Sequence, residues 1–549
     1  MAKRGTSAMV GPARAFGSFR LRGALISCIA LFLFLPDLSA HLQTGNVDQT
    51  SRLIAEGRAA LERGEFGVAR SFFMKVLEAR PDDVTAHTYL GVIADRLGDL
   101  AEAERHFARA AQLAPTSAAA RTNYGVVLYK RGRSQEAAVE FEAALKLDAE
   151  RVAALINLAQ IRFTEGTRAS LEQARGLFER AYRLAPDGAI GRALVIIGLR
   201  LGERERAAAA YQEYAARFAS DNAEESASLG KALLEAELFA EAANELERAV
   251  RLEPKNVEAI LWLAQAYLGL NDVQKAGRTL ETAVARGFDQ APIYALLAEV
   301  YERSGHPENA IPAMRLAIAR APQVEAYWFR YAMLLTDTQA PGAALIRLNE
   351  ALQRFPRSAR LWFAFGMANF KLNKNAEAAQ AFERALECEP GFVPALAYLA
   401  LTRVEVGQYA EAVKLFEKTL ALNDHLAIVH YLLADTLLKQ NAEPRRVEEH
   451  LKRAIELDRS FAPARLALGK LYMREERWAE AAEALERAVE IEPDRAEAYY
   501  QLGRAYARLK RTEEARAVLQ KFKLLSERQK EQEQRERREI VQRLANVRF

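Results

Sequence analysis

The sequence predicts an all-α protein, a solenoid of about fourteen tandem helical hairpins. Half of the 549 residues are hydrophobic and only 17 are proline, a composition typical of a folded, helix-rich chain. Apolar residues recur three and four positions apart, the spacing of one helix face. The whole pattern repeats with a period of 34 residues from about Thr50, and this period overrules the three or four domains that length alone suggests.

Residues 359–390 show one repeat clearly. Trp362 and Gly366 share one face of a first predicted helix, and Ala378 and Phe382 share one face of a second. The two small residues let the helices approach closely, and a polar turn joins them. A hairpin of this size cannot bury its own apolar faces, so it requires neighbours of the same kind.

The same small position recurs in every predicted hairpin with one exception in each helix. In the first helices the residues are Gly57, Gly91, Gly125, Ala159, Val195, Gly230, Ala264, Ala298, Ala332, Gly366, Ala400, Ala434, Gly469 and Gly503. In the second helices they are Ala69, Ala103, Ala137, Ala174, Ala207, Ala242, Ala276, Ala310, Ala344, Ala378, Ala412, Val447, Ala481 and Ala515. A bulky apolar residue follows four positions after each member of the second set.

This pattern resembles the tetratricopeptide repeat family, whose 34-residue helix–turn–helix unit has these small and aromatic positions. The resemblance covers residues 50–525. It implies a right-handed superhelix in which the first helix of each unit lines a concave groove and the second packs behind it. Three extra residues between Thr167 and Leu171 predict a longer turn inside that unit.

The N-terminus is expected to be a secretory signal peptide, residues 1–40, followed by a short linker over 41–49. Five Lys or Arg residues precede the apolar stretch 24–35, and small residues lead up to a cleavage point after Ala40. The protein is therefore expected to be exported, periplasmic or secreted. An uncleaved membrane anchor at 24–35 is the alternative.

Charge and cysteine content narrow the function further. Without residues 1–40 the chain has 72 basic and 72 acidic side chains, so no overall field favours nucleic acid. Cys388 would be the only remaining cysteine, which leaves no intramolecular disulfide to stabilise the fold.

The repeat pattern ends before a charged C-terminal helix expected over 526–549. Its last part carries an apolar stripe of Ile540, Leu544 and Val547. We expect either a solvated helix whose stripe folds back as a cap, or a helix for docking or dimerisation.

The sequence contains no motif of catalytic or cofactor chemistry. It lacks a glycine-rich phosphate loop, an HExxH motif, a cysteine cluster and a GxSxG elbow. The seven histidines are scattered, and His425 and His430 do not share a helix face. We therefore expect no enzyme activity, no cofactor and no metal site.

With no catalytic motif, a binding surface is the remaining basis for a function. The groove positions implied by the resemblance are unusually apolar in the ninth to twelfth units. Met and Phe side chains there suit an adaptable surface for a peptide or helix, although packing between neighbouring units would explain the same stripe. The candidate groove consists of Phe329, Met333, Phe363, Met367, Phe370, Leu401, Val404 and Tyr431.

The sequence thus predicts a non-enzymatic scaffold of the cell envelope that binds a peptide or helix of a protein partner in the groove. Two alternatives remain. One is a component of envelope or exopolysaccharide-export assembly, and the other is the regulatory subunit of a separately encoded enzyme. Oligomeric state is left open, because the C-terminal stripe could serve a dimer as well as the favoured cap.

Overall fold

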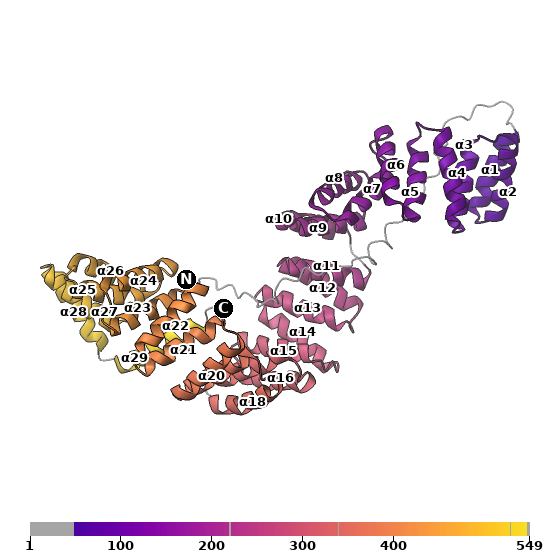
Figure 1. Ribbon diagram of the computed structural model, residues 1–549. Helices are drawn as coiled ribbons and strands as arrows, with labels where there is room; N and C mark the ends of the chain where they lie inside the picture. The colour runs from indigo at the N-terminus through magenta and orange to yellow at the C-terminus, as the bar shows by residue number, and fades with distance from the viewer. Residues whose placement is uncertain (1–48, 219–220, 339, 527–528, 546–549) are drawn as a thin grey trace. The chain divides into compact units, whose positions relative to one another are not determined.

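A computed structural model describes residues 49–218, 221–338, 340–526 and 529–545 (Figure 1). Regular structure in these ranges consists of twenty-nine α-helices and no strand, which confirms the predicted all-α solenoid. The chain divides into two compact units, residues 1–283 and 284–549. The expected signal peptide, its cleavage point at Ala40 and the end of the stripe at Val547 lie outside the described residues.

In both units an odd-numbered helix pairs with the even-numbered helix that follows, and that second helix packs on the next first helix. The first unit contains α1 Gln49–Glu62, α2 Phe66–Ala79, α3 Val84–Arg96, α4 Leu100–Leu113, α5 Ala118–Lys130, α6 Ser134–Leu147, α7 Val152–Glu165, α8 Arg168–Leu184, α9 Gly188–Leu201, α10 Arg204–Arg217, α11 Ala223–Glu235, α12 Phe239–Leu252, α13 Val257–Gly269 and most of α14 Val273–Ala285.

The second unit contains seven further hairpins and a final helix among the described residues. They are α15 Ala291–Arg303, α16 Pro307–Arg320, α17 Glu325–Asp337, α18 Pro341–Arg354, α19 Ala359–Lys371, α20 Asn375–Cys388, α21 Val393–Glu405, α22 Tyr409–Leu422, α23 Ala427–Lys439, α24 Pro444–Leu457, α25 Ala462–Arg474, α26 Trp478–Ile491, α27 Ala496–Arg508, α28 Thr512–Ser526 and α29 Gln529–Ala545.

The small repeat positions lie where the two helices of a hairpin meet. A Cβ atom added to Gly91 would lie 2.7 Å from the Phe107 ring, so this approach requires glycine unless the ring shifts. Ala103 and Phe107 of the second helix are both buried there. The 34-residue signature is therefore a packing signature, because each small residue makes room for a bulky one across the hairpin.

The turns between paired helices are short and depend on left-handed backbone. Gly98 has a φ of +82° between α3 and α4, and Asn373 has a φ of 58° between α19 and α20. Gly and Asn are the residues that adopt this conformation with least strain.

Two irregular units differ from the sequence-based expectation in instructive ways. The predicted longer turn near Thr167 is wrong: α7 ends at Glu165, and the extra residues lengthen α8 to 17 residues. The Thr167 side chain accepts a hydrogen bond from the Ser170 backbone amide, so the helix begins directly after Thr167.

In the next hairpin Val195 is wholly buried, and Gly198 lets α9 approach Ala207 of α10.

Among the described helices, none is both long enough and apolar enough to cross a membrane.

Candidate functional site

The candidate groove residues lie on four consecutive first helices of the second unit, α17, α19, α21 and α23. We call the side formed by the first helices α17 to α25 the inner face. Seven of the eight residues join one hydrophobic cluster, and Met333 is half-buried on α17. Met367 is only 2% exposed, Leu401 7%, and Phe363 and Phe370 8% each, so these four side chains are already packed. Their use in binding a partner stays a prediction.

Tyr398 lies at the centre of the aromatic part of this cluster. Its ring centroid is 5.5 Å from that of Phe363, 6.1 Å from Phe370 and 5.9 Å from Phe382. The ring is wholly buried, and this burial raises the pKa of its hydroxyl. Sequence reasoning missed Tyr398, although its place two residues before the small Ala400 was a usable signal.

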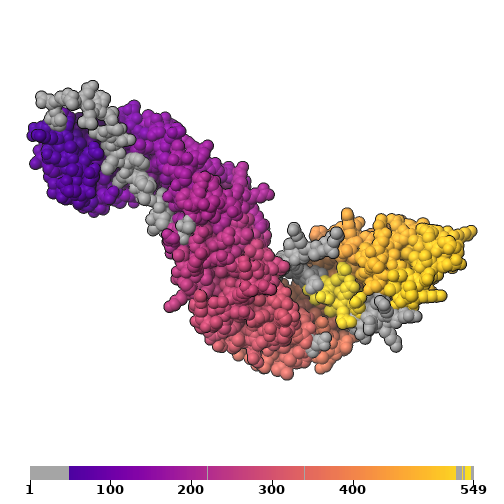
Figure 2. All heavy atoms as spheres, turned by 180° about the vertical axis from the view of Figure 1, so that it is seen from behind, coloured from indigo at the N-terminus to yellow at the C-terminus, as the bar shows by residue number. Residues whose placement is uncertain are grey.

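The C-terminal helix α29 lies on the inner face, where it packs against α23 (Figure 1). Leu544 is completely buried in the cluster, and Ile540 and Val541 pack against it. The Tyr398 hydroxyl donates a hydrogen bond of 3.2 Å to the backbone carbonyl of Val541, 143 residues further along the chain. Figure 2 shows the yellow C-terminal helix against the orange repeats of the second unit. The stripe thus packs back within its own chain.

Charged contacts fix the orientation of α29. Arg543 Nη1 lies 2.7 Å from Asp458 Oδ2, and its guanidinium lies 4.6 Å from the centroid of the Phe461 ring. Burial tends to raise the pKa of Asp458, but hydrogen bonds from Ser460 and Arg543 outweigh it and hold that pKa below its usual value. Nearer the start of α29, Arg535 Nη1 lies 3.0 Å from Asp494 Oδ2.

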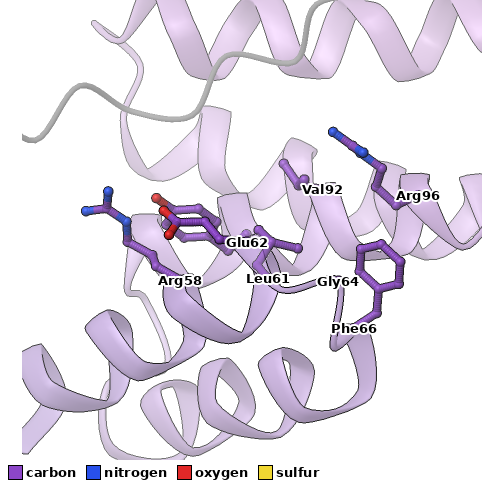
Figure 3. A pocket seen from close by; sticks show the side chains of 8 residues that line it. Arg58, Leu61, Glu62, Gly64, Phe66, Val92 and Arg96 are labelled. Atoms are coloured by element: carbon purple, nitrogen blue, oxygen red, sulfur yellow. The ribbon is translucent and has the colours of Figure 1, made fainter.

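A second candidate site is a pocket of about 370 Å³ in the first unit, over α1, α2 and α3 (Figure 3). Arg58 and Arg96 lie on opposite sides of it. Tyr89, which is 1% exposed, lines the pocket, and its hydroxyl has no hydrogen-bond partner among the described residues. Burial raises the pKa of this hydroxyl. The other lining residues are Leu61, Glu62, Gly64, Phe66 and Val92.

Two histidine pairs, which sequence reasoning also missed, occupy equivalent places in the second and twelfth hairpins. The Nδ1 atoms of His87 and His106 are 3.0 Å apart, and so are those of His430 and His450. In each pair the first histidine also places Nε2 3.0 Å from a backbone carbonyl, that of Pro81 or Asp424. Burial is the main cause that lowers the pKa of His106 and of His450, the latter to about 4. Burial therefore favours the neutral form of His106, His430 and His450.

Within the part of the chain that the structure describes, no three His, Cys, Asp or Glu side chains come together as a metal site.

Models of the tetratricopeptide repeat match most of the array. One model matches residues 54–118, 96–145, 122–189, 341–391, 399–460 and 466–527, more than half of the sequence. Others match 233–300, 291–324 and 381–414. The chain therefore belongs to the tetratricopeptide repeat family, a class of helical-repeat proteins that are generally non-catalytic and bind protein partners.

Several solved structures are similar to this chain. The structure of the APC/C hetero-tetramer Cut9-Hcn1 matches 84% of this chain and 96% of that one, at 15% identity and a TM-score of 0.38. MamA matches 32% of this chain and 94% of its own, at 24% identity and a TM-score of 0.29. YrrB, described as having an unusual peptide-binding site, matches 32% and 90%, at 26% identity and a TM-score of 0.29. Among curated proteins, no sequence matches significantly.

Proposed function

We propose that this protein is a non-enzymatic scaffold of the cell envelope that binds a segment of a partner protein on the inner face of its second unit. One observation carries the proposal: this face holds a helix, α29, by burying Leu544 completely in the cluster that contains the candidate groove residues. A surface that accepts one amphipathic helix has the apolar depth and the polar rim that helix recognition in a groove uses.

The chemistry of the inner face supports a protein ligand. Phe329, Val404 and Tyr431 are partly exposed beside the buried cluster and offer apolar contact. Arg360 and Lys371 are exposed at the ends of α19 and offer charge at the rim. Several such contacts, each weak, add up along a repeat array because they lie on one continuous face.

The test uses charge reversal at the exposed rim, because reversal inside the packed cluster would unfold the repeat. Photo-crosslinking from position 431 identifies the partner, and its affinity for the purified full chain is then measured. We expect Arg360→Glu/Lys371→Glu to weaken partner binding at least 10-fold. The matched control Lys414→Glu/Lys418→Glu makes the same charge change at exposed positions of α22 and should bind as wild type does. Equal binding by both variants would contradict the inner face as the site.

The envelope location is a separate part of the proposal and has its own test. It rests on the basic and apolar pattern of residues 1–40. Cell fractionation followed by N-terminal sequencing should find a mature chain that begins at His41 outside the cytoplasm. A chain that starts at Met1 in the membrane fraction would indicate the anchor at 24–35, and the same start in the cytoplasm would contradict export.

A further inference from the structure

The part of α29 that contacts the inner face is a short amphipathic segment. Ile540, Val541 and Leu544 form an aliphatic ridge at spacings of one and four residues, which places them together on one side of the helix. Arg543 extends from the edge of this ridge to Asp458. Gln542 points to solvent. The segment therefore has the form of a helical recognition motif with apolar anchors and a charged edge.

The contacts of α29 involve three different repeats of the second unit. The Val541 carbonyl is held by Tyr398 of α21, in the eleventh hairpin. Arg543 meets Asp458, at the end of α24 in the twelfth hairpin. Arg535 meets Asp494, just before α27 in the fourteenth. Since Arg535 meets the fourteenth hairpin, whereas Val541 and Arg543 meet the eleventh and twelfth, the helix runs against the order of the array and crosses several units.

These contacts are specific, but each holds the helix only weakly. The Arg543 and Asp458 side chains are 30% and 29% exposed, and Arg535 is 72% exposed, so water screens both ion pairs. Leu544 is the one side chain of α29 that is buried among those described. Because α29 belongs to the same chain as the face it occupies, its docking is intramolecular, with an effective concentration on the order of millimolar. A segment of modest affinity can thus occupy the face through its attachment.

We propose that the inner face of α21 to α25 is a receptor for an amphipathic helix with an Ile-Val-x-Arg-Leu pattern, and that α29 is its resident occupant. A partner helix with the same ridge and arginine displaces α29 and takes its contacts with Tyr398, Asp458 and Phe461. This inference rests on the proposed function, because it names the class of partner for the same face. In the protein without a partner, α29 covers the binding face, so partner binding depends on release of α29.

The experiment measures exchange with a labelled synthetic peptide of residues 529–549 and the full-length chain. Leu544→Asp places a charge at a wholly buried position and should release α29. We expect this variant to bind the peptide at least 10-fold more tightly than wild type, by fluorescence anisotropy. Gln542→Ala, at the exposed position, should bind as wild type does. Equal affinities of wild type and Leu544→Asp would overturn the proposal.

A second pair of variants identifies the site and does not depend on the Leu544 substitution. Arg543→Glu places a carboxylate opposite Asp458. Repulsion between the two should also release α29, with a smaller gain in peptide affinity than Leu544→Asp gives. Asp458→Arg introduced into Leu544→Asp should weaken peptide binding at least 5-fold, and a peptide carrying Arg543→Asp should restore it. Peptide binding that is unchanged by Asp458→Arg would overturn the assignment of the peptide to the inner face. Circular dichroism of each chain confirms that its helices are intact.

Two further outcomes separate this inference from its alternatives. Partner binding that responds to Arg360→Glu/Lys371→Glu but not to Leu544→Asp would overturn the exchange and leave the scaffold function standing. Partner binding that is unchanged by Arg360→Glu/Lys371→Glu and by Leu544→Asp would contradict the exchange and the proposed function together. A wild-type chain that sediments as a dimer, when Leu544→Asp sediments as a monomer, would show that α29 of a second copy fills the face, and would overturn occupation within one chain.

Discussion

Tyr89 in α3 and Tyr398 in α21 occupy the same place in their repeats, yet their hydroxyl groups meet different surroundings. Each lies two residues before the small residue of its first helix, and each ring packs on the bulky aromatic residue of the preceding hairpin. The centroid distance is 4.8 Å from Tyr89 to Phe73 and 5.9 Å from Tyr398 to Phe382. The Tyr398 hydroxyl donates to α29, whereas the Tyr89 hydroxyl is buried beside the pocket of α1 to α3 and has no hydrogen-bond partner among the described residues.

The comparison separates what a repeat position does for folding from what it does for binding. The ring fills the same gap between hairpins in both units, so it belongs to the packing of the array. The Tyr398 hydroxyl also forms a hydrogen bond, to the carbonyl of Val541. In the second unit the chain supplies that carbonyl from its own C-terminus. The two positions therefore share one packing role and differ in the hydrogen bond of the hydroxyl.

Removing the whole ring should have the largest effect. Tyr398→Ala and Tyr89→Ala each leave a cavity in a packed interface, with an expected loss of about 3–5 kcal/mol of local stability. Only Tyr398→Ala should also remove the hydrogen-exchange protection of α29. Exchange measured by mass spectrometry on both variants checks this. Unchanged protection of α29 in Tyr398→Ala would break the link between this residue and the C-terminal helix.

Acid should weaken both units through His106, His430 and His450, because burial in the folded state disfavours protonation of these three rings. With an ordinary pKa of 6.5 when unfolded and a pKa of about 4 when folded, His450 takes up its proton first in the unfolded chain. Above pH 6.5 it has no effect. As the pH falls from 6.5 towards 4, stability is lost, by up to about 3 kcal/mol for this group.

Urea denaturation of wild type and His450→Gln checks this, at about pH 7.5, above the window, and at about pH 4.5, near its lower end. The neighbouring Arg446 and His430 also lower the pKa of His450, and both remain in the variant. We expect the pH dependence to shrink in His450→Gln. If His450→Gln loses stability with acid as steeply as wild type does, His450 is not a cause of the acid sensitivity.

Removing only the hydroxyl sharpens the comparison most directly, with a smaller effect. Tyr398→Phe loses a hydrogen bond to Val541 and should weaken the docking of α29 by about 1 kcal/mol. Tyr89→Phe removes a buried hydroxyl that has no partner among the described residues and should leave stability unchanged or slightly raised. Denaturation and α29 exchange on the two variants give the test. Equal losses in both would mean that the Tyr89 hydroxyl is also satisfied.

The ion pairs of α29 should have the smallest effect. Arg543→Ala removes a partly exposed contact with Asp458 and Phe461, so we expect a loss of about 0.5–1 kcal/mol in α29 docking, reduced further at high salt. Arg535→Ala, at a more exposed position, serves as the matched control and should have almost no effect. A larger loss for Arg535 than for Arg543 would mean that the first part of α29 holds the helix.

The repeat architecture was predictable from sequence because its cause is local. Small and bulky residues such as Gly366 and Phe382 meet within one hairpin, so their spacing is visible in the chain. The extra residues near Thr167 were misplaced because the residues after an N-cap continue a helix as readily as they form a turn.

The long-range contacts were not predictable in this way. The stripe of Ile540 and Leu544 was visible in the sequence, but the place where it packs was not. Tyr398, which contacts Val541 there, is 143 residues away from it, and this separation follows no repeat period. The histidine pairs join residues 19 and 20 apart across a hairpin, which a search along a single helix face does not find.

Hydrogen exchange of α29 in the full-length chain, with and without a saturating excess of the peptide of residues 529–549, tests the central claim most directly. If α29 is the resident occupant of the inner face, its amides are protected in the free chain and lose that protection when the peptide is added. The repeats α21 to α25 should stay protected throughout. Amides of α29 that exchange freely before any peptide is added, or that stay protected at saturation, would contradict the account.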